Sequence, residues 1–357
     1  MENLLKIGFI LSPFFIYILV GKPILTSQAI LSILVELIII LLFLSGSWNK
    51  RTPDIKASIF FFAYILVMSG WIIGKGLLLD DRISMVTRPL LHVSIFFLFY
   101  FALCYILDGT RYNEIAKVIV YPAITLSAIC LFQKAGIDMF KYSEEWVNGT
   151  LGNPTNSAMY LCACVPFAFI HKRPFIPVIF ILAGIMVCSS ASALIAALIV
   201  IFIYFLVKKK YFLTISLTIF IMAIIFLFKN SLLEFFNSFD KLCVWQRAIM
   251  DWKEHYLFGN GLDAFRNLGV IFNNSIYDFT HNHYIWILHS LGLVGLVLFV
   301  NWICSLKFIF NSDDIRCYAT LSLVAVGVMA CVSVPMRVYP IILITAVNLA
   351  IITKERA

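Results

Sequence analysis

The sequence predicts an all-α integral membrane protein with about twelve transmembrane helices. Two bulk properties point there: 62% of the residues are hydrophobic and only 13% are charged, and the mean hydropathy is +0.97. A soluble domain carries about 45–50% apolar and about 25% charged residues, so this composition belongs to the membrane class. The third observation is the length of the apolar runs, since a bilayer core takes roughly 20 residues per helix.

The apolar runs follow one another along the chain and are joined by short polar connectors. The candidate spans are 6–21, 24–45, 57–75, 90–107, 116–133, 157–171, 174–189, 191–207, 212–229, 284–306, 317–334 and 338–353. There is no internal repeat and no low-complexity tract. We therefore expect residues 1–357 to form a single polytopic membrane domain.

Basic residues occupy alternate connectors, and this pattern orients the predicted helices. With a cytoplasmic N-terminus, the cytoplasmic connectors hold Lys50-Arg51 with Lys56, Arg111 with Lys117, Lys172-Arg173, Lys208-Lys209-Lys210, Lys307 with Arg316, and Lys354 with Arg356. Short cytoplasmic loops of membrane proteins carry an excess of lysine and arginine. The pattern predicts that both termini are cytoplasmic. It also accounts for the net charge of +8 without a nucleic-acid partner.

The opposite face carries the long polar connectors, 76–89, 134–156 and 230–283. Two of them are rich in aromatic and acidic residues, and long ordered loops often carry function. We expect 134–156 and 230–283 to hold the active site, with short helices in the larger loop. In a bacterium this face of the inner membrane would be the periplasmic one.

Three motifs lie in or beside these outer loops. They are Gly149-Thr150-Leu151-Gly152-Asn153-Pro154-Thr155-Asn156, then Trp245 through Phe265 with the turn Gly259-Asn260-Gly261, and His281-Asn282-His283-Tyr284 running into Leu291-Gly292-Leu293-Val294-Gly295. Their order and shared face resemble the bacterial O-antigen ligase and O-antigen polymerase superfamily of membrane glycan transferases. The resemblance covers mainly residues 149–300. It departs from the family pattern at Ala191 and Lys241, which stand where the family has arginines.

The resemblance implies an inner-membrane glycosyltransferase of lipopolysaccharide biosynthesis. It would move a glycan from undecaprenyl diphosphate to a sugar hydroxyl of an acceptor glycolipid or glycan, without a metal or another cofactor. The family base corresponds to His281, and a neutral imidazole suits the removal of a hydroxyl proton. On a continuous helix His283 would point about 200° away, so we expect it to be structural. A histidine that merely caps a helix is the alternative interpretation of His281.

The leaving diphosphate gains negative charge in the transition state, and fixed cations would have to stabilise it. The outer-face cations include Arg82 and Arg266, and the predicted diphosphate-binding set is Arg88, Lys241, Arg247 and Arg337. Asn282 and Trp245 complete the predicted substrate-binding set, Asn282 through its amide and Trp245 by stacking on a sugar ring. Interfacial arginines and tryptophans also anchor helices in the bilayer surface, which is the competing interpretation.

Other residue patterns carry less functional information. The acidic pairs Asp80-Asp81 and Glu144-Glu145 are more typical of solvated loops than of a metal site, and the cysteines lack metal-ligand spacing and suit apolar packing. Among functions, the motifs slightly favour a ligase over a polymerase that joins repeat units. A transporter or flippase of lipid-linked sugars is a less favoured alternative, because such proteins often show repeats and midplane charges.

Overall fold

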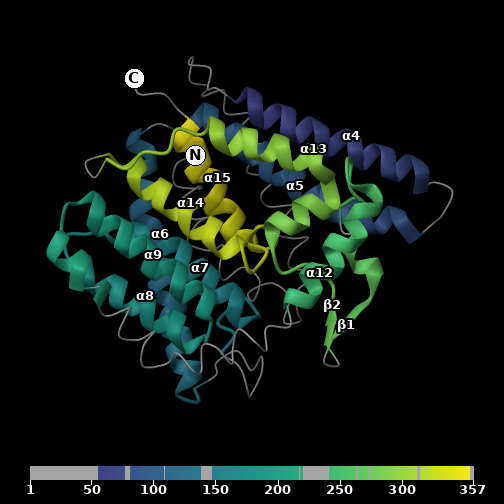
Figure 1. Ribbon diagram of the computed structural model, residues 1–357. Coiled ribbons are helices and arrows are strands. Elements are labelled where there is room, and N and C mark those ends of the chain that lie inside the picture. The colour runs from purple at the N-terminus through teal and green to yellow at the C-terminus, as the bar shows by residue number, and fades with distance from the viewer. Residues whose placement is uncertain are drawn as a thin grey trace.

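The computed structural model describes residues 55–76, 81–107, 109–137, 147–216, 218–219, 241–262, 264–272, 275–311 and 314–353. These residues form an all-α bundle with one small hairpin (Figure 1). The helices are α4 (Lys56–Gly76), α5 (Asp81–Ile106), α6 (Gly109–Lys134), α7 (Pro154–Ala168), α8 (Phe175–Val187), α9 (Ala191–Val207), α12 (Lys241–Trp252), α13 (His283–Ser305), α14 (Arg316–Ala330) and α15 (Tyr339–Thr353). The short elements are η1 (Lys253–His255), η2 (Ala264–Leu268), β1 (Val270–Phe272), β2 (Ser275–Tyr277) and η3 (Pro335–Arg337).

Every predicted span that lies wholly within the described residues coincides with a helix. The predicted spans 6–21 and 24–45 lie outside those residues, as does most of 212–229. Two described helical stretches, Arg111–Lys134 and His283–Ser305, are long and apolar enough to cross a membrane. Helices of this length and composition also occur as buried core helices of soluble proteins.

Helices α7 and α15 form the centre of the bundle. Residues 157–168 of α7 are all buried, and so is every residue of α15. Helix α7 packs against α6, α8, α9 and α14, while α15 packs against α5 and α14. Helices α4 and α13 lie together on the far side of α5, which gives the bundle two halves joined by the central helices (Figure 1).

The start of α5 differs from the prediction. We expected a connector at 76–89 and a span from 90, but the helix already begins at Asp81 and contains Pro89. Proline lacks the N–H that an interior helical residue would donate, so it commonly marks a boundary in sequence-based prediction. Arg88 therefore lies within a helix rather than in a connector before one.

The first motif is a capped turn into α7. The side chain of Asn153 accepts hydrogen bonds from the backbone N–H groups of Thr155 and Asn156, at 2.8 and 3.3 Å, and Pro154 occupies the first helical position. Both residue types are favoured at these positions of a helix N-terminus. The Ser157 hydroxyl ties the preceding loop to the helix by donating to the Asn148 carbonyl at 2.7 Å.

The second motif is inserted into a break of α13. Gly292 has φ +68° and ψ −170°, which interrupts the helix. Backbone N–H groups of Asn260 and Gly261 donate to the carbonyls of His289 and Ser290, both at 2.9 Å. On the other side of the break, the N–H groups of 293 and 294 donate to the carbonyls of 256 and 257. The loop thus supplies partners for the backbone groups that an unbroken helix would pair internally.

Candidate active-site cavity

A cavity of about 890 Å³ lies between α4, α5, α13, α14 and α15. Most of its wall is apolar and comes from residues such as Phe61, Phe96, Trp302 and Leu349. At one end the wall becomes polar and includes side chains from four separate parts of the chain. These polar residues include Asn153, Asn156, Arg266, Asp278, His283, Ser333 and Arg337.

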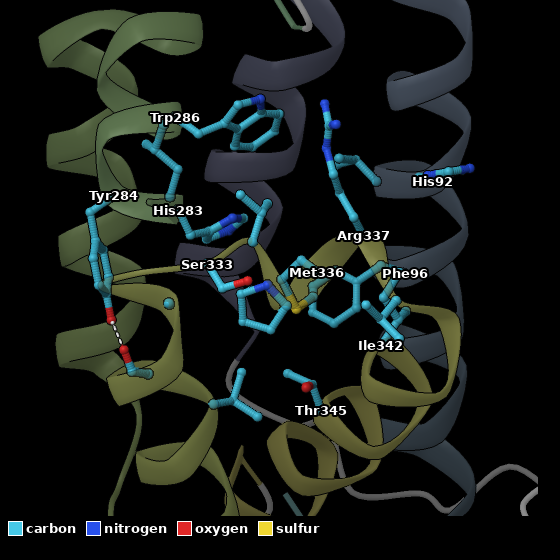
Figure 2. Close-up of a pocket in the computed structure, with 18 of the residues that line it drawn as sticks. His92, Phe96, His283, Tyr284, Trp286, Ser333, Met336, Arg337, Ile342 and Thr345 are labelled. Atoms are coloured by element: carbon cyan, nitrogen blue, oxygen red, sulfur yellow. Dashed lines mark hydrogen bonds between the residues drawn. The ribbon is translucent and has the colours of Figure 1, made fainter. Parts of the chain in front are cut away.

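The polar end brings two of the three sequence motifs together. Asn153 and Asn156 come from the first motif, and His283 with Tyr284 comes from the third. No residue of the second motif lines the cavity, although Arg266, which follows the motif in η2, does. The motif instead bonds to the backbone of α13 at its break. Figure 2 shows His283 and Trp286 on the α13 side of the cavity and Arg337 extending beside them.

Asn282 is a structural cap of α13. Its side-chain oxygen accepts from the N–H groups of Tyr284 and Ile285, both at 3.0 Å, and its amide donates to the Cys331 carbonyl at 2.7 Å. The Tyr284 hydroxyl adds a bond to the Gly327 carbonyl at 2.9 Å, drawn in Figure 2. Because both of its polar groups already have partners, Asn282 holds the third motif against the end of α14 and has little capacity left for a substrate.

His281 precedes α13 rather than belonging to it, because the helix begins at His283. Its backbone has φ +51°, a conformation that residues with a side chain rarely adopt. The comparison of His281 and His283 on one continuous helix is therefore wrong. The His281 ring lies against Phe279, with 4.1 Å between ring centroids, and 5.6 Å from the Tyr277 ring.

Two cations lie near His281. Burial is the main reason that its pKa falls from 6.5 to about 4, and the positive charges of Lys241 and Arg337 lower it further. The guanidinium of Arg337 lies 4.8 Å from the centroid of the Phe279 ring. Lys241 donates to the Val332 carbonyl at 3.0 Å, and burial lowers its pKa as well. His281 is therefore a neutral imidazole at pH 7, beside positive charge.

Phe279 separates His281 from the cavity. Phe279, His283 and Arg337 line the cavity, whereas His281 and Lys241 are not part of its wall. The sequence-predicted residues thus form two adjoining groups: His281 and Lys241 behind Phe279, and Arg337 on the cavity side. The structure brings His281, Lys241 and Arg337 close to one another, and of the three only Arg337 lines the cavity.

The other predicted binding residues lie elsewhere or cannot be placed. Arg247 is exposed on α12, and Trp245 is half-buried on the same helix; neither lines the cavity. Arg88 lies on α5, but its side chain is outside the described part of the structure. The acidic pairs 80–81 and 144–145 also fall wholly or partly outside it, and no group of three metal-ligating side chains occurs among the residues that are described.

Sequence reasoning missed several residues of the cavity. Arg266 is an outer-face cation outside the predicted binding set, and Asp278 and Phe279 belong to no motif, although all three lie in the predicted loop 230–283. Trp286 is 8% exposed, and its indole N–H has no hydrogen-bond partner among the described residues, so it can donate to a ligand. No periodicity or motif marks Arg266, Asp278 or Phe279, because only the fold of the loop brings them to the cavity.

A buried polar cluster supports α13 near its break. The His289 ring lies 2.8 Å from a carboxylate oxygen of Asp251, and the Asn260 amide donates to the same oxygen at 3.0 Å. His289 is fully buried, and Asp251 lies in the last turn of α12. Helix α12 is therefore fixed to α13 at its C-terminal end, while Lys241 at its other end contacts the α14 terminus.

No protein-family model matches the chain, and no curated protein sequence is significantly similar to it.

Proposed function

We propose that this chain is an integral membrane glycan transferase that acts at the outer face of the bacterial inner membrane. Its donor would be a glycan on undecaprenyl diphosphate, and its acceptor a sugar hydroxyl on a glycolipid or a growing glycan. The single observation that carries the proposal is the cavity, in which motif residues from distant parts of the chain meet a guanidinium at the polar end of a long apolar pocket.

Exposed apolar faces support a membrane location. Phe60, Val67, Ile176 and Ile179 are each at least 65% exposed, and they belong to α4 and α8 on different sides of the bundle. Monomeric soluble proteins rarely leave such apolar surface uncovered over several elements, because its hydration is unfavourable. A lipid environment removes that penalty, so the outward faces of these helices suit a bilayer.

The shape of the cavity suits a lipid diphosphate. Its apolar wall continues from His283 at the start of α13 to Leu306 and Phe308 beyond its end, which would accommodate a polyprenyl chain. Arg337 at the polar end offers the planar pair of N–H donors that matches a phosphate group. The Trp286 indole N–H and the Asn156 amide provide further donors or acceptors for the diphosphate and the first sugar.

In this proposal His281 accepts the proton of the attacking hydroxyl, and Lys241 and Arg337 stabilise the leaving diphosphate. When the anion binds, its charge offsets the two cations that depress the His281 pKa, so the imidazole becomes a stronger base in the complex than in the free protein. The Phe279 ring would have to rotate for the hydroxyl to reach His281. His283 reaches the cavity directly and is the alternative acceptor.

The break in α13 bears on the flippase alternative. Broken helices in transporters leave backbone groups open to bind substrate or ions. In α13 the groups at the break are bonded to the 256–261 loop, and the Leu291 carbonyl also accepts from the Tyr64 hydroxyl at 2.7 Å. The break therefore positions a loop and offers no open ion site, which favours the transferase.

The test is glycan transfer in membranes of a host that lacks its own enzyme of this type. We expect the wild-type chain to extend or attach glycan and His281→Ala to abolish this while the protein stays inserted. Accumulation of full-length lipid-linked glycan in the variant would indicate a ligase, and accumulation of single repeat units a polymerase. Normal surface glycan in both His281→Ala and His283→Ala would contradict the proposed chemistry.

A further inference from the structure

Two cysteine thiols on neighbouring helices are in contact close to the first motif. The sulfur atoms of Cys130 in α6 and Cys188 at the end of α8 lie 3.7 Å apart, and both residues are buried. One turn earlier the two helices approach closely, since a Cβ on Gly184 would lie 2.6 Å from the Ser127 hydroxyl oxygen. The close packing of the two helix backbones therefore holds the two sulfur atoms in contact.

The basic connectors indicate the compartment that these thiols face. Helix α6 begins beside Arg111, and α8 begins directly after Lys172-Arg173, so the positive-inside rule places both starting ends in the cytoplasm. Cys130 and Cys188 lie near the opposite ends of these helices. Disulfides form and persist in the bacterial periplasm, where thiols are oxidised, and are rare in the cytosol.

We propose that Cys130 and Cys188 form a disulfide that ties the outer ends of α6 and α8 together beneath the first motif. The sulfurs would move closer by roughly 1.7 Å, from their present contact to a bond of about 2.05 Å. The Gly149 backbone rests directly on this pair, because a Cβ there would lie 3.1 Å from the Cys130 sulfur. The bond would therefore fix the base of the loop that brings Asn153 and Asn156 to the cavity.

The oxidant is the disulfide of a periplasmic thiol–disulfide oxidoreductase. One cysteine thiolate attacks that disulfide to give a mixed disulfide, and the second thiolate displaces the enzyme. The two thiols lose two protons and two electrons, and the oxidoreductase leaves as a dithiol. Because both sulfurs are buried in the folded bundle, the exchange takes place before α8 packs fully against α6.

The other cysteines provide controls for the pair. All nine cysteines of the chain lie within the described residues, and Cys130 and Cys188 are the two whose sulfur atoms are known to lie 3.7 Å apart. Cys162 is fully buried in α7, and Cys243 is exposed on α12. They serve as a matched core control and as a reporter of orientation.

The test uses the full chain in bacterial membranes. Free thiols are blocked in denaturant with N-ethylmaleimide, and the protein is then reduced and labelled with a maleimide-polyethylene glycol. We expect two labels on the wild type and on Cys162→Ala, and none on Cys130→Ala or Cys188→Ala. Mass spectrometry of the unreduced wild type should also give the linked Cys130–Cys188 peptide. Free thiols at both positions in the wild type would overturn the inference, as would two labels remaining on Cys130→Ala.

The inference shares only the helix orientation with the proposed function and does not need glycan transfer to occur. A membrane-impermeant maleimide applied to spheroplasts tests that orientation through Cys243. Labelling of Cys243 together with free Cys130 and Cys188 would overturn the disulfide and leave the transferase proposal standing. Labelling of Cys243 only after the membrane is opened would overturn both.

Discussion

At the scale of single residues, His281 carries the most specific evidence for function. Its left-handed backbone costs about 1–2 kcal/mol for a residue with a side chain. The buried Thr280 holds this turn by donating to the Asn282 carbonyl at 2.8 Å. Strained residues cluster at active sites because the surrounding structure keeps a useful side-chain position. Here the strain directs the imidazole toward Phe279 and the two nearby cations.

The two histidines of the third motif should respond differently to substitution. If His281 is the base, His281→Ala should lower kcat by about 100-fold or more, which is the usual contribution of general base catalysis. His283→Ala removes a ring that stacks on Trp286 at 5.3 Å, so it should mainly raise KM. Initial rates with a defined lipid-linked donor measure both. The reverse pattern would assign the base to His283.

The acid limb of the pH–rate profile should report the charges around His281. A general base is inactive when protonated, so kcat/KM should fall only near pH 4, where the free protein binds a proton at His281. Lys241→Gln removes one of the two cations that lower this pKa, so the limb should move to higher pH, toward 6.5. Arg247→Gln, on an exposed position of α12, is the matched control and should leave the limb in place.

At the scale of elements, the break in α13 explains the glycine motif better than a helix-ending turn alone. The N–H of Gly259 does close such a turn by donating to the His255 carbonyl at 2.8 Å. Its second role is close packing, because a Cβ there would lie 2.5 Å from the backbone nitrogen of Gly292. Gly259 and Gly292 belong to separate motifs, and their close packing requires a glycine at both positions. Neither motif shows this requirement on its own.

Gly259→Ala should destabilise the protein more than a substitution at a similar glycine without neighbours. The variant combines a positive φ with a backbone clash, and the φ alone costs about 1–2 kcal/mol. Gly269 also has a positive φ but nothing within 4 Å of its Cβ position, so Gly269→Ala isolates the conformational cost. Thermal unfolding in detergent compares the two. Equal losses of Tm would show that the contact with Gly292 contributes nothing.

The junction of α12 and α13 should depend on Asp251. Asp251→Ala removes the partner shared by the His289 ring and the Asn260 amide, and an unsatisfied polar group on the fully buried His289 costs about 1–3 kcal/mol. Asp251→Asn keeps an oxygen at that place and should lose less stability. If α12 also shifts in Asp251→Ala, Lys241 moves away with it. The acid limb of the kcat/KM profile, which reports the pKa of His281, should then move to higher pH. Identical melting curves for the two variants would argue against a structural role of the cluster.

At the scale of the whole molecule, the sequence predicts helices well and contacts poorly. Apolar runs of bilayer length locate α4 to α9 and α13 to α15, because a long run has few alternatives to a helix. The β1–β2 hairpin, the break at Gly292 and the early start of α5 leave no comparable pattern. Family motifs and charge single out His281, Lys241 and Arg337 in the sequence, whereas Asp278 and Phe279 are identified only by their place in the cavity wall.

The apolar length of the cavity leads to a prediction that does not depend on the identity of the base. Ile342 lines the cavity within α15, below the polar end (Figure 2). Ile342→Trp should fill the path of a polyprenyl chain and raise KM for a long-chain donor about tenfold, a loss of about 1.4 kcal/mol of binding. A short-chain donor that ends above Ile342 should be affected far less, because its diphosphate still reaches Arg337. Val297→Trp, on the exposed face of α13, controls for the added indole. Equal changes in KM for both donors would mean that the lipid lies outside this cavity.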